Sequence, residues 1–207
     1  MKLTLLMLNN RISKGIVLAL VLICLFLLWG LPNIYRFLSE EKPVQTDVLI
    51  VQGWLYPFMY DEVAKRIHCD SLSLIIVTGK RKDTLYGKSQ LIRRGICPDK
   101  IDVAPYDERL TFSGTFQEAY TLRTFLKAKY PGVTAVNIFT ISVHGRKSLV
   151  MFKRVLGKDV EVGVLTCKKN AFDETRLWHS WMGISLTIKY FIGYLYALVW
   201  PIEESAG

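Results

Sequence analysis

The feature that most constrains the fold is an alternation of short apolar runs with segments of helical periodicity between residues 47 and 165. Five apolar runs predict strands, and these cover residues 47–51, 74–77, 100–103, 136–141 and 160–165. Four intervening segments predict helices, and these cover residues 58–68, 84–94, 115–129 and 145–156. Strands that are apolar throughout and alternate with helices form a parallel sheet covered on both faces. We therefore predict an α/β fold with three layers and a mostly parallel sheet.

A charge-free segment over residues 15–35 precedes these elements. Its apolar part is long enough to cross the hydrocarbon core of a bilayer as a helix. Three basic residues and no acidic residue come before it: Lys2, Arg11 and Lys14. Because positive charge favours the cytoplasmic side, we predict a cytoplasmic N-terminus and one transmembrane anchor within residues 1–35. The alternative is a cleaved signal peptide, although residues 29–33 contain no small-x-small cleavage site.

The rest of the chain divides into three predicted parts. Residues 36–46 are polar and predict a linker, and residues 47–176 hold the α/β domain. Residues 177–207 predict an aromatic helix in which Lys189 is the one charge between Ser180 and Trp200. Aromatic density of this kind is typical of a membrane interface and also of a helix packed on a domain, while a second span would bury a lysine in lipid. These alternatives remain open at this point.

The formal charge of +9 indicates an anionic partner, either a membrane surface or a phosphorylated ligand, or a surface kept soluble near a negative membrane. Nucleic acid is not an expected partner, because the chain has no zinc-finger spacing, no aromatic RNA-binding signature and no basic heptad region. The cysteines are Cys24, Cys69, Cys97 and Cys167, without C-x-x-C pairs or metal-binding spacing. We expect no metal site; apolar packing is the ordinary role of such cysteines, and a disulfide among the last three is the alternative.

The carboxyl ends of parallel strands meet at one edge of a sheet, which is where α/β folds bind ligands. The last predicted strand-to-helix junction of this kind brings a hydroxyl, an imidazole and two cations to the start of residues 145–156, and a helix start attracts anions. The candidate ligand-binding residues at this edge are Gln52, Gly53, Thr78, Gly79, Lys80, Ser113, Thr115, Ser142, Arg146 and Lys147, and the candidate catalytic residue is His144. Each also has an ordinary alternative role as a turn glycine, a helix cap, a structural histidine or a solvated cation.

Four blocks of sequence, in their order and spacing, resemble the YdcF/SanA/ElyC-like family. They are Asp47-Val48-Leu49-Ile50-Val51-Gln52-Gly53-Trp54-Leu55, Ile75-Ile76-Val77-Thr78-Gly79-Lys80, Thr115-Phe116-Gln117-Glu118-Ala119 and Thr140-Ile141-Ser142-Val143-His144-Gly145-Arg146-Lys147-Ser148. The segment from Trp178 to Trp200 is similar to the closing segment of the membrane-anchored variant. The resemblance implies a Rossmann-like fold, a single anchor in the bacterial inner membrane and a domain that faces the periplasm or the cell exterior. It also implies a role in maintaining envelope polysaccharide or peptidoglycan, without a defined reaction or cofactor.

The chain departs from the family pattern where the family carries acidic residues. Gln52 stands where an acidic residue is usual, Lys80 stands where a second glycine is usual, and no glutamate opens the predicted helix 84–94. Fewer carboxylates mean fewer candidates for metal binding and for a general base. The remaining donors suit an anion, and so the expected function is binding of a phosphorylated or nucleotide-like ligand, which could be a lipid-linked sugar.

Two other functions remain as alternatives. One is a phosphate-ester hydrolase or transferase that uses His144 as acid or base and Ser142 or Thr115 as an orienting hydroxyl, although the chain has no G-x-S-x-G elbow. The other is a non-catalytic interaction scaffold with the aromatic tail as its contact surface. A dinucleotide oxidoreductase is not expected, because no G-x-G-x-x-G follows the first strand.

Overall fold

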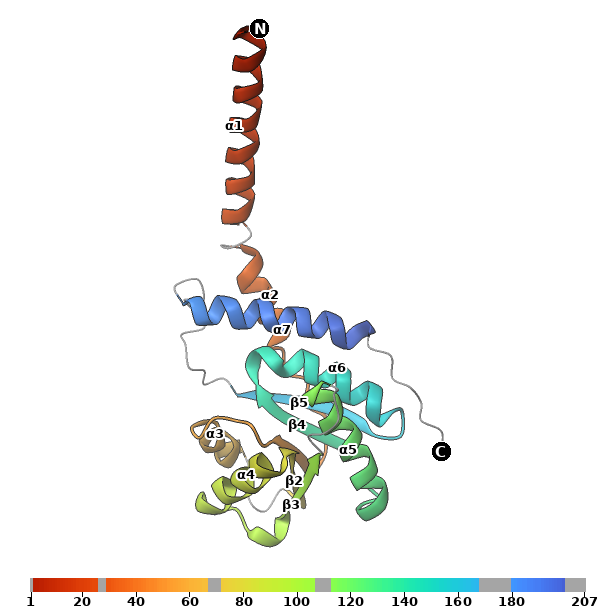
Figure 1. Ribbon diagram of the computed structural model, residues 1–207. Coiled ribbons are helices and arrows are strands. Elements are labelled where there is room, and N and C mark those ends of the chain that lie inside the picture. The colour runs from red at the N-terminus through yellow and green to blue at the C-terminus, as the bar shows by residue number, and fades with distance from the viewer. Residues whose placement is uncertain (1, 26–28, 67–71, 107–112, 168–179, 200–207) are drawn as a thin grey trace.

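Five parallel strands form the centre of the molecule in the order β3-β2-β1-β4-β5 (Figure 1). The computed structural model describes residues 2–25, 29–66, 72–106, 113–167 and 180–199. The strands are β1 (Val48–Gln52), β2 (Leu74–Lys80), β3 (Ile101–Tyr106), β4 (Ala135–Ile141) and β5 (Glu161–Cys167). All four strand pairs are parallel, and the predicted α/β fold with a parallel sheet is confirmed.

Helices cover both faces of the sheet and explain why the central strands are apolar throughout. On one face, α3 (Met59–Arg66) and α4 (Arg81–Arg93) pack against the side chains of alternate strand residues such as Val51 and Ile75. On the other face, α5 (Gly114–Lys129) and α6 (Gly145–Leu156) pack against the residues between them, such as Ile50 and Ile76. Because the chain crosses from β3 at one edge to β4 beside β1, the direction of winding reverses between β1 and β4. This order is consistent with a Rossmann-like fold.

Most predicted boundaries differ from the observed ones by one to three residues. The helix predicted over 145–156 matches α6, whereas the helix predicted over 84–94 begins earlier, at Arg81. The reason is that β2 continues through residues 78–80, beyond the predicted strand end at residue 77, and passes directly into α4. The helix predicted over 58–68 is observed as α3, and the end of its predicted range lies outside the described residues.

The segment predicted as a linker packs against the sheet. It begins in α2 (Leu31–Leu38), and the side chain of Leu38 is fully buried. Lys42 forms an antiparallel bridge with Val164, and the side-chain amide of Asn137 pairs with both the N–H and the carbonyl of Val44. Residues 36–46 are therefore held to the domain by backbone hydrogen bonds rather than joined to it loosely.

The two apolar helices outside the sheet layers are α1 (Lys2–Leu25) and α7 (Trp181–Val199). Among the described residues, the helix long and apolar enough to cross a membrane is α7, near the C-terminus, and the apolar stretch Lys14–Leu25 of α1 is shorter. This differs from the prediction of a candidate span at the N-terminus. The N-terminal anchor stays a prediction. In Figure 1, α1 projects from the domain and α7 lies across the end from which it projects.

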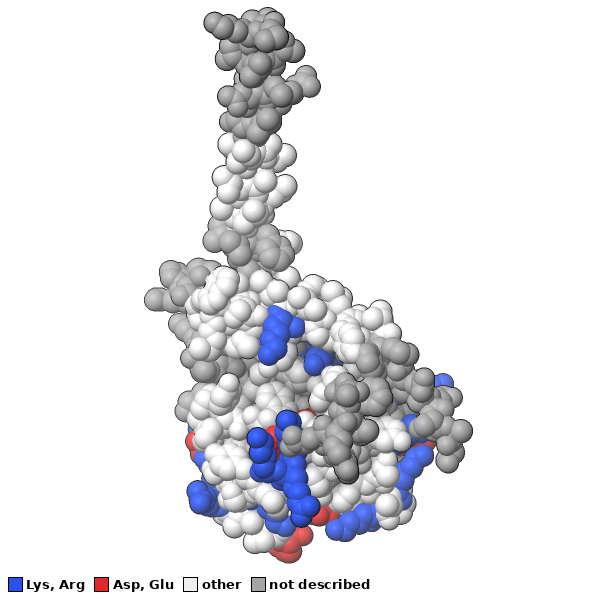
Figure 2. Space-filling model, viewed as in Figure 1, with Lys and Arg blue, Asp and Glu red and all other residues white. Residues whose placement is uncertain are grey.

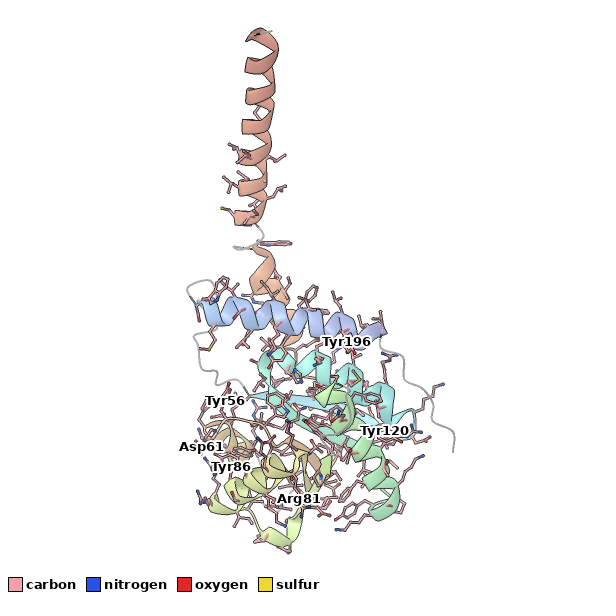
Figure 3. All side chains as sticks on the ribbon, in the orientation of Figure 1. Tyr56, Asp61, Arg81, Tyr86, Tyr120 and Tyr196 are labelled. Carbon is pink, nitrogen blue, oxygen red and sulfur yellow. The ribbon has the colours of Figure 1, made fainter. Side chains whose placement is uncertain are left out.

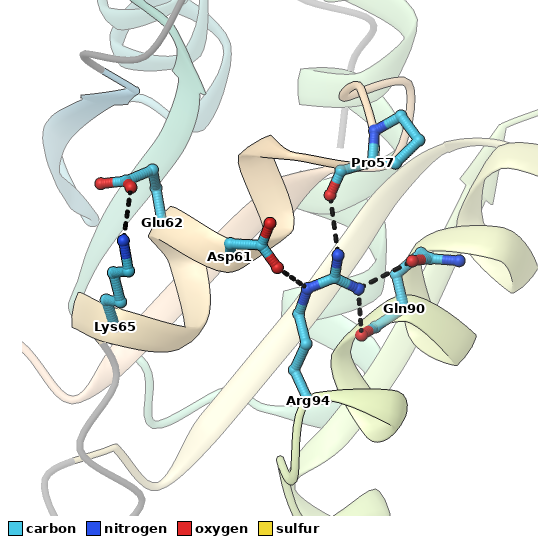
Figure 4. A network of polar contacts seen from close by, with 6 residues as sticks. All are labelled: Pro57, Asp61, Glu62, Lys65, Gln90 and Arg94. Carbon is cyan, nitrogen blue, oxygen red and sulfur yellow. Dashed lines mark hydrogen bonds and ion pairs between the residues drawn. The ribbon is translucent and has the colours of Figure 1, made fainter.

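The two helices α3 and α4 are joined by Arg94, directly after α4 (Figure 4). Its guanidinium donates to the Asp61 carboxylate at 2.6 Å, to the Pro57 carbonyl at 2.9 Å and to the side chain of Gln90 at 2.7 Å. A planar guanidinium with several fixed acceptors stabilises more than a single exposed ion pair does.

We expect Arg94→Ala to lower the free energy of unfolding by about 1–2 kcal/mol, because it removes these hydrogen bonds. Urea denaturation of the purified chain measures this loss. The matched control is Arg93→Ala, which removes the same side chain from an exposed position one residue earlier. Equal losses in the two variants would show that Arg94 does not join the helices.

Candidate functional site

The carboxyl end of β1 lies beside the carboxyl end of β2 and next to β4. Gln52 pairs with Thr78 in the sheet, and both side chains are fully buried. His144 follows β4 in a short 3-10 turn, Ser142–His144, and its ring meets the ring of Trp54 edge-on with centroids 5.3 Å apart. The structure thus brings His144 to the same edge of the sheet as Gln52, Gly53, Thr78 and Gly79.

The glycines at this edge let a helix approach the strands. A Cβ on Gly53 would lie 2.8 Å from the carbonyl oxygen of Asp83, so any larger residue would displace the first turn of α4. Gly79 has a φ of 142°, a conformation that other residues rarely adopt. These glycines therefore serve the contact between strand and helix, and the space beside Gly53 is filled by backbone.

Glu118 is the main residue of the site that the sequence analysis missed. Its side chain is buried in the first half of α5 and accepts a hydrogen bond from the Gln52 amide at 2.6 Å. Burial raises the pKa of Glu118 to about 7, although hydrogen bonds from Gln52 and Trp54 and the charge of Lys147 oppose the shift. A carboxyl group of this kind exchanges its proton near neutral pH, as a general acid or base must.

A helical spacing could have revealed this carboxyl group. Thr115, Glu118 and Leu122 are three and four residues apart, and so they share one face of α5. Leu122 is in the apolar core, and Thr115 and Glu118 are buried on the same face of α5, nearer the helix start. An apolar stripe that ends in a threonine and a glutamate predicts buried polar groups near the start of the helix.

His144 is nearly as buried as Glu118, with 4% of its surface exposed. Its Nε2 lies 3.3 Å from the hydroxyl of Thr115, and its ring lies between Trp54 and Tyr190, the latter at a centroid distance of 4.9 Å. Burial, followed by the charges of Lys147 and Lys189, holds the pKa of His144 well below its ordinary value. The imidazole is therefore neutral at pH 7 and can accept or donate a hydrogen bond.

Several buried polar atoms at this edge have no hydrogen-bond partner within the described part of the chain. They are Gln52 Oε1, Thr78 Oγ1, His144 Nδ1 and, one turn into α6, Ser148 Oγ. Buried polar groups are nearly always paired, because an unpaired one loses its hydrogen bonds to water without replacement. Their gathering around the reversal point of the sheet favours the binding of a polar ligand there.

The predicted cations divide between two places. Arg146 pairs with Glu40, donates from Nε to the Phe37 carbonyl at 2.6 Å and stacks 3.9 Å above the Phe37 ring, so it joins α6 to the end of α2. We predicted that Arg146 binds a ligand, but in the structure its guanidinium already contacts Glu40 and Phe37. Lys147 remains with the site: burial lowers its pKa, and the charge of Glu118 opposes this shift.

Three other predicted residues lie at the margin of the site. Ser142 is buried, and its hydroxyl is 3.0 Å from that of Tyr35 on α2, which makes it a packing contact with that helix. Lys80 and Ser113 precede α4 and α5, and neither side chain caps its helix. The structure therefore groups Gln52, Thr78, Thr115, His144 and Lys147 around the missed Glu118.

Among the described residues the site is buried: Gln52, Glu118 and His144 each expose 4% of their surface or less. Trp54 and Tyr190 contact the His144 ring on its edges, and the two cavities of about 520 and 360 Å³ lie elsewhere. The first is near the amino ends of the strands, beside Asp47 and Ser73, and the second is between the end of α5 and the turn from α6 to β5, beside Leu126 and Val160. The sequence predicted an open edge, whereas the described residues bury the His144 ring there.

Within the described ranges, no group of three His, Cys, Asp or Glu side chains could hold a metal ion. Cys97 is exposed and Cys167 is buried, whereas Cys69 lies outside the described residues. A scan against protein-family models and searches of curated proteins and solved structures found no match. The family resemblance therefore stays a prediction.

The raised pKa of Glu118 predicts how stability changes with pH. Because the folded chain holds this proton more tightly than the unfolded chain does, the contribution of Glu118 to the free energy of unfolding is greatest below about pH 4.5 and falls as the pH rises toward 7. We expect Glu118→Gln to remove this decline, measured by urea denaturation across that interval. Glu161→Gln, at an exposed position on β5, is the control and should follow the unmodified chain. A decline that persists in Glu118→Gln would contradict the burial of a protonated carboxyl.

Proposed function

We propose that this chain is a membrane-anchored cell-envelope protein of the YdcF/SanA/ElyC-like kind that binds an anionic, phosphorylated or nucleotide-like ligand at the carboxyl edge of its sheet. The observation that carries the proposal is the group of unpartnered buried polar atoms beside Lys147. The setting would be the bacterial inner membrane, with the domain on the outer side and a role in maintaining envelope polysaccharide or peptidoglycan.

The charges of the site support an anion as the ligand. Lys147 is partly desolvated, and an ammonium group in such surroundings interacts more strongly with a phosphate than one in water does. Glu118 lies close enough to interact with it, but a pKa of about 7 lets this carboxyl carry a proton when an anion approaches. His144 Nδ1 and Ser148 Oγ can then donate hydrogen bonds at the start of α6, where the helix dipole also favours negative charge.

The net charge of +9 and the apolar helix α1 support the anchor. The basic residues that precede residue 15 favour a cytoplasmic N-terminus, and so the α/β domain would lie on the opposite side of the membrane.

Removing the ammonium group should weaken ligand binding. We expect Lys147→Ala to lower the affinity of the full chain roughly tenfold or more, the loss of one charge-assisted hydrogen bond. Binding is measured with a polyprenyl phosphate in vesicles and, separately, with a soluble nucleoside diphosphate, so that the two sources of phosphate are distinguished. Lys153→Ala removes an exposed lysine from the same helix and should bind as the unmodified chain does. No binding of either probe by the unmodified chain would refute the proposal.

A second candidate function is hydrolysis or transfer of a phosphate ester, and the pKa of Glu118 favours it. A carboxyl that titrates near pH 7 can, in its protonated form, donate a proton to the leaving oxygen, and the neutral His144 can accept one from water or a hydroxyl nucleophile. The hydroxyl of Thr115, 3.3 Å from His144 Nε2, would orient the imidazole.

If the chain hydrolyses or transfers phosphate esters, the full chain should turn over phosphomonoesters or pyrophosphates. We expect His144→Ala and Glu118→Gln each to lower kcat by about 10² or more, because each removes a group that transfers a proton. Lys153→Ala should leave kcat unchanged. Absence of turnover in the unmodified chain would leave ligand binding alone as the proposed function and exclude the enzymatic candidate.

A further inference from the structure

The outer face of α7 is largely apolar along its length, with Ser185 and Lys189 as its exposed polar residues. Trp181, Ile188, Ile192, Leu195 and Val199 recur at helical spacing, and each exposes between 41% and 81% of its surface. The helix has no acidic residue, and Lys189 is its one charge. Monomeric soluble proteins rarely expose a continuous apolar stripe of this length, and such a stripe marks an interaction surface.

The inner face of the same helix covers the candidate site. Gly183, Thr187 and Ala197 are buried against the domain. Tyr190 meets the His144 ring, and the Lys147 side chain lies against the backbone of Gly193. A helix that crossed the membrane would lose these contacts, and so the structure favours a helix that stays on the domain.

The position of α7 indicates which partner its outer face meets. In Figure 1, α7 lies crosswise to α1, over the end of the domain from which α1 projects. The ring of Phe37 in α2 meets the ring of Tyr194 in α7 at 5.2 Å, which fixes the two helices to each other. A bilayer crossed by α1 would therefore lie against the outer face of α7.

The charge distribution agrees with this position. On the face seen in Figure 2, the part of the domain beneath α1 is mostly white with some Lys or Arg and no visible Asp or Glu, whereas more charged residues of both signs lie toward the opposite end. Figure 3 labels Tyr196 on α7 and, near the opposite end, Arg81 and Tyr86 of α4. An apolar helix flanked by aromatic residues and carrying a lysine suits the boundary between lipid headgroups and acyl chains.

We infer that α7 lies in the plane of the membrane interface, with its outer face in the lipid bilayer and its inner face as the roof of the site around His144 and Glu118. The inference rests on the proposed membrane anchor. It adds that the bilayer is itself a partner of the domain and contacts the element that closes the site.

Photo-crosslinking in the full chain tests this placement. A benzoylphenylalanine is introduced at Trp181, Ile188 or Leu195, which lie seven residues apart on one face, in chains reconstituted into vesicles of phosphatidylethanolamine and phosphatidylglycerol. We expect several-fold more lipid adduct at these positions than at Leu85, an equally apolar and exposed position on α4. Mass spectrometry locates each adduct along the acyl chain, and an in-plane helix gives the same shallow depth at all three positions.

The alternatives give different results. Depth that changes steadily from Trp181 to Leu195 would show that α7 crosses the bilayer, and adducts to a second copy of the chain would show a protein interface; either result overturns the inference. Leu18, on α1, reports the anchor separately. Lipid adducts at Leu18 without adducts on α7 would reject the membrane contact of α7 and support the anchor. Adducts on α7 without adducts at Leu18 would reject the anchor and support the membrane contact of α7.

Discussion

The candidate site depends on one buried hydrogen bond, from the Gln52 amide to the Glu118 carboxyl. It joins the end of β1 to α5 at the point where the winding of the sheet reverses, and it involves a group whose charged form is costly to bury. With a carboxylate at position 52, two acidic groups would share this space and repel each other, so the glutamine at this position makes the burial of Glu118 tolerable. The site therefore retains one acidic group with a pKa near 7.

The polar cluster is closed by elements outside the sheet. Arg146 fastens α6 to α2 through Glu40 and Phe37, and α2 in turn contacts α7, whose Tyr190 covers His144. Residues 36–46 run along β5 and hold this arrangement to the sheet. The parts of the chain predicted as anchor, linker and C-terminal helix therefore contact one another beside the site.

The sequence predicted the sheet well, because burial of both faces leaves a strong signal: five apolar runs became five parallel strands, and α6 has its predicted bounds. It did not show the contacts of side chains whose partners are distant in the chain. Arg146 looks like an anion-binding cation until Glu40 lies beside it, and Glu118 looks like a solvated helix residue until Gln52 and Trp54 cover it. The start of α4 was missed for a local reason, since β2 has no turn after Thr78. The closure of the site could not be predicted either, because it depends on where α7 packs.

Three titratable groups of the site are held toward their neutral forms by the same burial. The pKa of Glu118 is raised, and those of His144 and Lys147 are lowered. A protonated Glu118 and a neutral His144 leave fewer charges to bury under Tyr190. An anion placed among these groups would favour the protonated form of Glu118, so binding would draw a proton into the site. The proton on Glu118 removes a repulsion, and the ammonium group of Lys147 supplies an attraction, so the buried cluster becomes complementary to a negative ligand.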